Sequence, residues 1–169
     1  MRTTRYDLDP FFSRRFSPTE FEARALEDAE LEALIEAAST APSCYNEQPW
    51  RFVLADHGIL SGLLAPANQA WAHHAARLVL LCCDTRFVRN GKTNRYAAFD
   101  SGTAWGYLGM EAYRRGILVH AMAGFDAERA VEVLGLGELK PLAMIALGYS
   151  KQGHTMTPRK GLDEVIIRK

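Results

Sequence analysis

This sequence has few features of an extracellular or membrane-spanning protein. Its 169 residues include only three cysteines, an odd number without metal-ligand spacing, and two of them, Cys82 and Cys83, are adjacent in an apolar run. That pattern indicates buried, reduced thiols. No run is long and apolar enough to span a bilayer, and the first six residues have no apolar stretch behind their charges. We therefore expect a soluble, cytoplasmic protein with no membrane partner.

The sequence also lacks net charge. Lysine and arginine together number 20, and aspartate and glutamate also number 20. A neutral chain has a weak long-range field, whereas non-specific nucleic-acid binding depends on net positive charge, so we expect no nucleic-acid partner. The chain is long enough to bury a core without disulfides or metals, and we expect a single domain over residues 1–169.

Several common site motifs are missing. No Gly-x-Gly-x-x-Gly turn follows a predicted strand, and neither Gly-x-Ser-x-Gly nor a full Walker sequence, Gly-x-x-x-x-Gly-Lys-Ser/Thr, occurs. Gly135 and Gly137 follow a predicted helix, which is the wrong context for dinucleotide binding. His73 and His74 are adjacent, but neighbouring side chains point apart on a helix and no third ligand has a suitable spacing. We therefore predict no metal site.

The most distinctive segment is the loop of residues 41–52, where a predicted helix ends and a strand begins. Pro42 and Pro49 restrict φ and push the residues before them, Gln48 included, toward extended conformations. Asn46 and Gln48 offer amide groups that both donate and accept hydrogen bonds. Such a loop suits the edge of a planar heterocycle. The alternative is an ordinary connection in which Asn46 makes an Asx turn.

Three motifs carry a resemblance to one family. The spacing Pro-Ser-x-x-Asn-x-Gln-Pro-Trp-x-Phe at residues 42–52 resembles the signature loop of the nitroreductase family of FMN-dependent oxidoreductases. Residues 15–21 resemble that family's opening Arg-x-Ser-x-(Arg or Lys)-x-Phe, with Thr19 in place of the second cation. Residues 157–166 resemble its closing Arg-Lys-x-Leu-x-Glu-Val stretch. The motifs occur in the family's order, and the resemblance covers nearly the whole chain from Arg15 onward.

The resemblance implies a fold and an assembly. The fold is α+β, with three layers in which helices flank a central, mostly antiparallel sheet. The assembly is an intertwined homodimer with the cofactor at the subunit interface. Residues 1–16 would form an extended arm, which we expect to be irregular because Asp9-Pro10 breaks any helix. Residues 150–169 would form a tail that reaches the cofactor phosphate.

The resemblance also implies FMN as cofactor and NAD(P)H as reductant. It assigns the following residues to the cofactor site: Arg15, Phe16, Ser17, Thr19, Pro42, Ser43, Asn46, Asn68, Gln69, Met122, Ala123, Gly124, Arg159 and Lys160. Arg15, Ser17 and the tail cation would hold the phosphate, with Arg159 the first choice for that cation and Lys160 the second. Thr19 has a neutral hydroxyl, which stabilises negative charge on a reduced flavin less well than the family's usual cation.

The remaining positions would contact the ring system. Pro42, Ser43 and Asn46 belong to the signature loop. The backbone N–H of Ala123 would reach flavin N5, and Gly124 would allow close approach because it lacks a Cβ. Either Asn68 or Gln69 would reach the pyrimidine, and the sequence leaves their register open.

The implied activity is hydride transfer from NAD(P)H through flavin N5 to a small electrophilic acceptor, a nitroaromatic, quinone or enal, by a ping-pong mechanism. Because the flavin carries the chemistry, we assign no catalytic acid or base. Tyr45 and His120 only flank the cofactor segments. Two alternatives remain. One is a non-catalytic flavin carrier or sensor, which Thr19 keeps open, and the other is an interaction module that has lost the cofactor.

Periodicity and capping residues predict the elements between these motifs. The predicted helices span residues 28–41, with Asp28 as cap, 59–64, ended by Pro66, 99–115, and 126–134, with Asp126 as cap. The predicted strands span 50–55, 78–83, 117–120 and 141–149. In the first strand Leu54 falls on the buried face, and the run 78–83 is apolar on both faces, as a strand covered by helices would be. Residues 84–95 are polar and should form a mobile excursion that shapes substrate entry. The long helix contains Gly102, Gly106 and Gly109, which indicate close helix approach. Tight packing within the chain and a homodimer interface both explain them, and the resemblance favours the interface.

Overall fold

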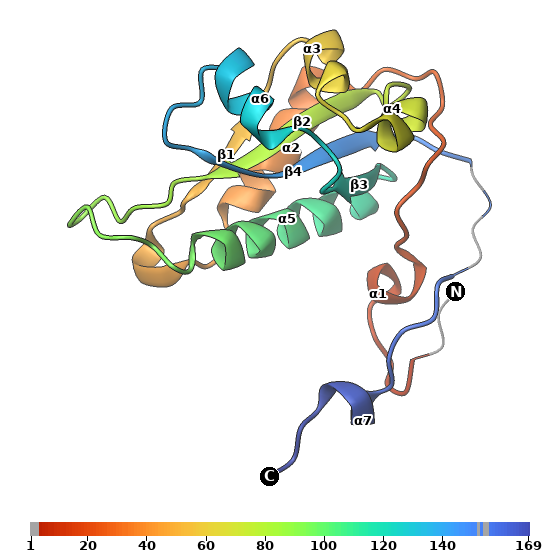
Figure 1. Ribbon diagram of the computed structural model, residues 1–169. Coiled ribbons are helices and arrows are strands. Elements are labelled where there is room, and N and C mark those ends of the chain that lie inside the picture. Colours follow the sequence, from red (N-terminus) through yellow and green to blue (C-terminus); the bar gives the residue numbers. More distant parts are fainter. Residues whose placement is uncertain (1–3, 152, 154–155) are drawn as a thin grey trace.

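The computed structural model describes residues 4–151, 153 and 156–169. At its centre is a four-stranded antiparallel sheet in the order β1-β2-β4-β3 (Figure 1). The strands are β1 (Trp50–Val53), β2 (Arg77–Cys83), β3 (Leu118–Met122) and β4 (Lys140–Gly148). The helices are α1 (Pro10–Arg14), α2 (Asp28–Ser39), the 3₁₀ turn η1 (Cys44–Asn46), α3 (His57–Gly62), α4 (Pro66–Ala72), α5 (Ala97–Arg114), α6 (Ala127–Val133) and α7 (Leu162–Val165). The predicted α+β fold with an antiparallel sheet between helices is confirmed.

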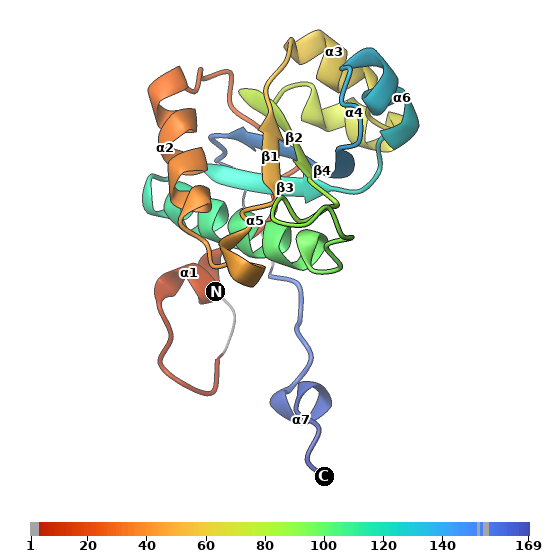
Figure 2. The same cartoon turned by 90° about the vertical axis from the view of Figure 1, so that its left-hand side faces the viewer.

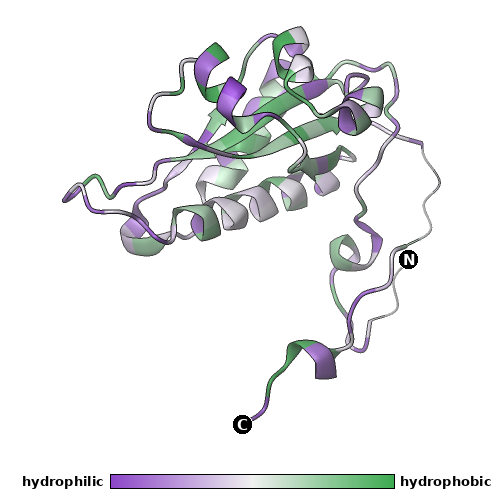
Figure 3. Ribbon diagram, in the orientation of Figure 1, coloured by the Kyte–Doolittle hydropathy of each residue, from purple (hydrophilic) through white to green (hydrophobic). Residues whose placement is uncertain are grey.

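The helices form a layer on each face of the sheet, with α2 and α5 on one side and α3, α4 and α6 on the other (Figures 1 and 2). Strand β2 is buried on both faces. Val79 and Leu81 pack with the α2 and α5 side, whereas Leu78 and Leu80 pack with the opposite side. Successive side chains of a strand point to opposite faces, so a strand covered on both sides is apolar throughout. Figure 3 shows this hydrophobic character along the sheet.

Two prolines begin helices that they were expected to interrupt or end. Asp9 caps α1, where its carboxylate accepts a hydrogen bond from Phe11 N at 2.8 Å, and Pro10 occupies the first helical position. Pro66 likewise opens α4, whereas we expected it to end the preceding helix. Proline suits the first helical position because the N–H that it lacks has no partner inside the helix. The prediction that Asp9-Pro10 breaks any helix is therefore wrong.

Other boundaries differ by a few residues. Helix α2 is capped by Glu27 rather than Asp28, because Glu30 accepts a hydrogen bond from Glu27 N at 3.2 Å. Strand β1 ends at Val53, and Leu54, predicted on the buried face, is 53% exposed. Asp126 caps α6 as predicted. Within the described part of the chain, no helix combines the length and apolar character needed to cross a bilayer.

The arm and the tail extend away from the sheet on the side of α5 (Figures 1 and 2). The predicted arm, 1–16, and the predicted tail, 150–169, both include positions outside the described residues. In the described part of the arm, α1 packs near α5, with the rings of Phe11 and Tyr113 5.6 Å apart. The tail contains the single turn of α7 and continues to Lys169.

Candidate functional site

The loop between α2 and β1 has an unusual backbone. Tyr45, Asn46 and Gln48 have φ values of 56°, 56° and 50°, in the left-handed region that non-glycine residues rarely occupy. Such conformations cost about 1–3 kcal/mol each and concentrate at functional sites. The expectation that Gln48 is extended is wrong, because the chain folds back at η1 and brings Gln48 N to Ser43. Pro42 is exposed at the start of this loop.

Hydrogen bonds that involve side chains help to hold the loop in this shape. Gln48 N donates to Ser43 Oγ at 2.9 Å, and Gln48 Nε2 donates to Asn46 O at 3.1 Å. Cys44 N donates to Asp100 Oδ2 at 3.0 Å, and Asp100 is only 4% exposed. Sequence reasoning missed this role of Asp100, since nothing local links two residues 56 positions apart. The loop is thus rigid while Asn46 remains exposed.

The segment that precedes α2 brings a cation and a hydroxyl together. Arg15 Nη1 donates to Ser17 Oγ at 3.4 Å. His120 Nδ1 lies 2.8 Å from Pro18 O and must carry the proton, because a carbonyl only accepts. The His120 ring also stacks on Trp71 at 4.7 Å. Two other residues predicted to bind the cofactor belong to the same segment. Phe16 is half-buried and Thr19 is exposed.

Gly124 lies against α4. Its carbonyl accepts hydrogen bonds from Ala65 N at 3.0 Å and from Asn68 Nδ2 at 2.9 Å. A Cβ at Gly124 would lie 2.6 Å from Asn68 Nδ2, so a side chain would displace that amide. Gln69 Nε2 instead donates to Ser61 O at 3.2 Å. Of the two alternatives left open by the sequence, only Asn68 faces the segment of Gly124.

Met122 and Ala123 lead into Gly124 from the end of β3. Met122 is 4% exposed and packs in the core with the α3, α4 and α6 side. Ala123 follows the strand and is exposed. The backbone of this segment and the small side chain of Ala123 are therefore accessible to a ligand, whereas the side chain of Met122 packs in the core.

The predicted tail cations lie elsewhere in a single chain. Arg159 and Lys160 line a cavity of about 810 Å³ between the arm and the tail, together with Arg5 and Tyr6. No residue of the segment 15–19 lines this cavity. The structure therefore brings Asn68 to Gly124 and Arg15 to Ser17, but it does not bring the tail cations into the same cavity as Arg15 and Ser17.

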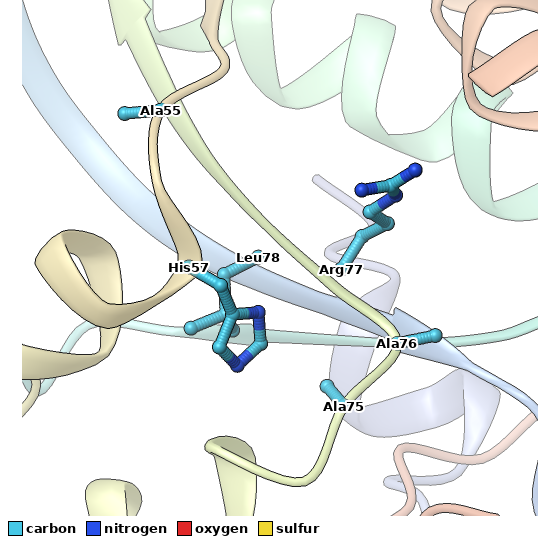
Figure 4. A pocket seen from close by; sticks show the side chains of 6 residues that line it. All are labelled: Ala55, His57, Ala75, Ala76, Arg77 and Leu78. Carbon is cyan, nitrogen blue, oxygen red and sulfur yellow. The ribbon is translucent and has the colours of Figure 1, made fainter. Parts of the chain in front are cut away.

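A second cavity, of about 300 Å³, lies between the end of β1 and the start of β2 (Figure 4). It is lined by Ala55, His57, Ala75, Ala76, Arg77 and Leu78. Arg77 points away from His57 and is engaged with Leu26 O at 3.1 Å and with the Asp28 carboxylate at 2.5 Å. His57 Nε2 lies 2.9 Å from His73 O. The polar side chains of this cavity are therefore engaged in structural contacts. None of the predicted site residues lines the cavity.

The cysteines and adjacent histidines show no reactive or metal-binding arrangement. Burial raises the pKa of the Cys82 thiol to about 12 and also raises the pKa of Cys83, so neither supplies a thiolate at neutral pH. Cys44 is free and half-buried. The rings of His73 and His74 lie 3.7 Å apart, so the expectation that they point apart is wrong, because the pair follows the end of α4. Among the described residues, no three His, Cys, Asp or Glu side chains form a metal-binding group.

Comparisons with known proteins show what this chain is similar to. The sequence profile described as "Nitroreductase family" matches residues 13–64, which contain the segment 15–19 and the strained loop. A solved structure described as an oxidoreductase containing FMN is 33% identical, with a TM-score of 0.85, over 89% of this chain and 81% of that one.

Two curated relatives give further matches. An uncharacterized 15.4 kDa protein of Mycolicibacterium smegmatis is 42% identical over 90 residues, 53% of this chain, and the match spans only 59% of that relative's length. A protein of Thermus thermophilus named NADH dehydrogenase is 28% identical, and the match covers 81% of this chain and 83% of that protein.

Proposed function

Because the chain belongs to the nitroreductase family, we propose that it is an FMN-dependent oxidoreductase that uses NAD(P)H as reductant. The similar structure that contains FMN and the relative named NADH dehydrogenase support this proposal. The structural observation that carries it is the contact of Gly124 with Asn68. The Asn68 amide leaves no room for a side chain at this position, so glycine is required here. We propose that a flat ring lies against this bare backbone.

We propose that the following side chains bind FMN. Arg15 and Ser17 lie side by side and would bind a phosphate through a guanidinium and a hydroxyl, and charge-assisted hydrogen bonds of this kind are the stronger ones. The strained loop would present Asn46 and the backbone near Ser43 to the ring system. Asn68 would set the edge of the site at Gly124.

The roles of the chain are binding, orientation and exclusion of water. Bound FMN supplies hydride acceptance from NAD(P)H and electron transfer to a second substrate, which we propose is a nitroaromatic, quinone or enal that uses the same site in a ping-pong mechanism. The backbone at Ala123 and Gly124 would lie against the ring, and the rigid loop would hold the ring at low entropic cost. We assign no side chain as a general acid or base.

We further propose a homodimer that uses the outer face of α5. Phe99 is 74% exposed, Met110 is 45% exposed and Tyr107 is 39% exposed, although all three are large apolar side chains. A Cβ added at Gly102 or Gly106 would touch nothing within 4 Å in this chain. Packing within the chain therefore does not explain these two glycines. A second α5 against this face would explain them, and it would give the extended arm and tail a partner to wrap.

A visible spectrum tests the function. We expect the purified protein to bind FMN, to lose the flavin absorbance when NADPH or NADH is added without oxygen, and to regain it with a quinone or nitroarene. A yellow protein that is not bleached by either reductant would instead be a carrier or sensor, the alternative that Thr19 keeps open. A protein that shows no binding in an FMN titration would refute the proposal.

The free cysteines bear on the cellular compartment of the protein. We propose a cytoplasmic protein, because all three cysteines are free and free cysteines are typical of reducing compartments.

A further inference from the structure

The connection between β2 and α5 is a hydrogen-bonded hairpin. Asn94 N donates to Thr85 O at 2.8 Å, Phe87 N to Lys92 O at 2.8 Å, and Gly91 N to Phe87 O at 2.8 Å. Phe87, in this hairpin, is only 9% exposed. We call residues 85–95 the basic hairpin. It projects beyond the sheet at the end where α5 begins (Figure 1).

The basic hairpin rests on the strained loop of the candidate site. The rings of Tyr45 and Phe87 meet edge to face with centroids 6.0 Å apart, and the Arg89 guanidinium lies 4.0 Å from the centre of the Tyr45 ring. Val88 N also donates to the Glu47 carboxylate. These contacts fix the hairpin beside the loop that would hold the flavin ring.

The hairpin is positively charged in a chain that has no net charge. Arg86 is paired with Glu138 at 3.5 Å. The other three cations, Arg89, Lys92 and Arg95, are exposed, and within the described part of the chain no carboxylate forms an ion pair with them. A group of cations beside a candidate site attracts anions and raises their local concentration.

We propose that the basic hairpin binds the phosphates of the dinucleotide reductant and thereby guides its nicotinamide onto the site. This inference rests on the proposed function. A dinucleotide places two or three phosphates at a distance from its reactive ring, so its phosphates would lie at the rim while the ring enters. Arg89 is the leading residue, because a guanidinium held over Tyr45 is already oriented, and its planar fork matches phosphate oxygens.

The test compares two reductants on the FMN-loaded protein: NADPH and the phosphate-free N-benzyl-1,4-dihydronicotinamide. We expect Arg89→Gln to raise the KM for NADPH about fivefold, and the double variant Arg89→Gln with Lys92→Gln to raise it about tenfold. Changes of this size correspond to the loss of exposed ion pairs. The kcat and the KM for the phosphate-free reductant should not change. Arg89→Lys should keep most of the NADPH affinity, and added salt should raise the wild-type KM for NADPH.

Matched variants separate charge from structure. Arg129→Gln removes an exposed cation from α6, on the other face of the sheet, and should change neither KM. Lys92→Gln removes charge without touching the contact of Arg89 with Tyr45. An equal rise in KM for both reductants would mean a distorted site and would overturn the proposal, as would an unchanged KM for NADPH in the double variant.

Two further outcomes identify the ligand. If Arg89→Gln raises the KM for anionic 4-nitrobenzoate but not for NADPH, the hairpin serves the acceptor and our assignment is wrong. If the wild-type protein is not reduced by NADPH at all, the proposed function fails, which is distinct from a reducible protein in which the hairpin variants behave like wild type.

Discussion

At the scale of single residues, the candidate site depends on a backbone that the protein holds in an unfavourable shape. Three non-glycine residues with positive φ lie within the four positions from Tyr45 to Gln48. Their strain must be offset by contacts, and the buried carboxylate of Asp100 makes the most remote of these. The hydroxyl of Ser43 makes another from within the loop.

Loss of the Asp100 carboxylate should release this loop. We expect Asp100→Ala to lower the free energy of unfolding by about 1–3 kcal/mol, because Cys44 N loses its acceptor. Asp100→Asn keeps an acceptor oxygen and should cost less. Urea unfolding of the three proteins measures the difference. Equal stability of the alanine variant and the wild type would contradict this role.

At the scale of elements, α5 combines a buried face, an open face and a charged end. Its last turn carries Glu111, which accepts hydrogen bonds from Arg114 at 2.7 and 2.8 Å and from Arg115 at 2.6 Å. These hydrogen bonds, with that of Arg114 the strongest influence, lower the pKa of Glu111 from 4.5 to about 2. Cations near the end of a helix also interact favourably with its dipole.

This lowered pKa predicts how stability changes with pH. A carboxyl whose pKa is lower in the folded state contributes stability above its unfolded pKa and loses it as the pH falls to the folded pKa. We therefore expect the wild type to exceed Glu111→Gln in free energy of unfolding by a constant amount from pH 7 to 5. The difference should shrink between pH 4.5 and about 2. Chemical unfolding of both proteins at each pH measures this difference.

At the scale of the whole molecule, one chain leaves the proposed cofactor site incomplete. The tail cations Arg159 and Lys160 line the cavity between arm and tail, whereas Arg15 and Ser17 lie outside that cavity. The outer face of α5 is also uncovered. A second copy of the chain would explain both observations, because it would cover α5 and would bind the tail.

The glycines of α5 allow a test of the dimer. A side chain at Gly106 meets open space within one chain, so Gly106→Glu should not destabilise a monomer. If α5 packs on a second α5, the same change should shift the protein toward monomer in sedimentation equilibrium. Gly62→Glu is the matched control, because Gly62 is a helical glycine on the other side of the sheet with equally open surroundings. A monomeric wild type would refute the interface.

The tail can be tested through the phosphate that distinguishes FMN from riboflavin. We expect Arg159→Gln to weaken FMN binding about tenfold, the loss of one hydrogen bond to a charged group, and to leave riboflavin binding unchanged. Fluorescence titration of both ligands measures this. Equal losses for FMN and riboflavin would place the effect of Arg159 away from the phosphate.

The sequence alone determined the features that depend on neighbours along the chain. The apolar run of β2 predicted a strand buried on both faces, and Asp126 predicted the start of α6. The order of three motifs predicted the family and, through it, the antiparallel sheet. These predictions succeeded because periodicity, caps and motifs are short-range properties. The same local reasoning failed at proline, which can either end a helix or begin one. Pro10 and Pro66 both begin helices.

Only the tertiary structure decided which distant groups meet. It selected Asn68 over Gln69 as the partner of Gly124, and it set Asp100 against Cys44, in both cases across 56 residues. It also gave Gln48 a left-handed backbone despite the proline that follows. The physical reason is that sheet register and helix docking set these contacts, and the free energy of a packed core outweighs the preference of a single residue.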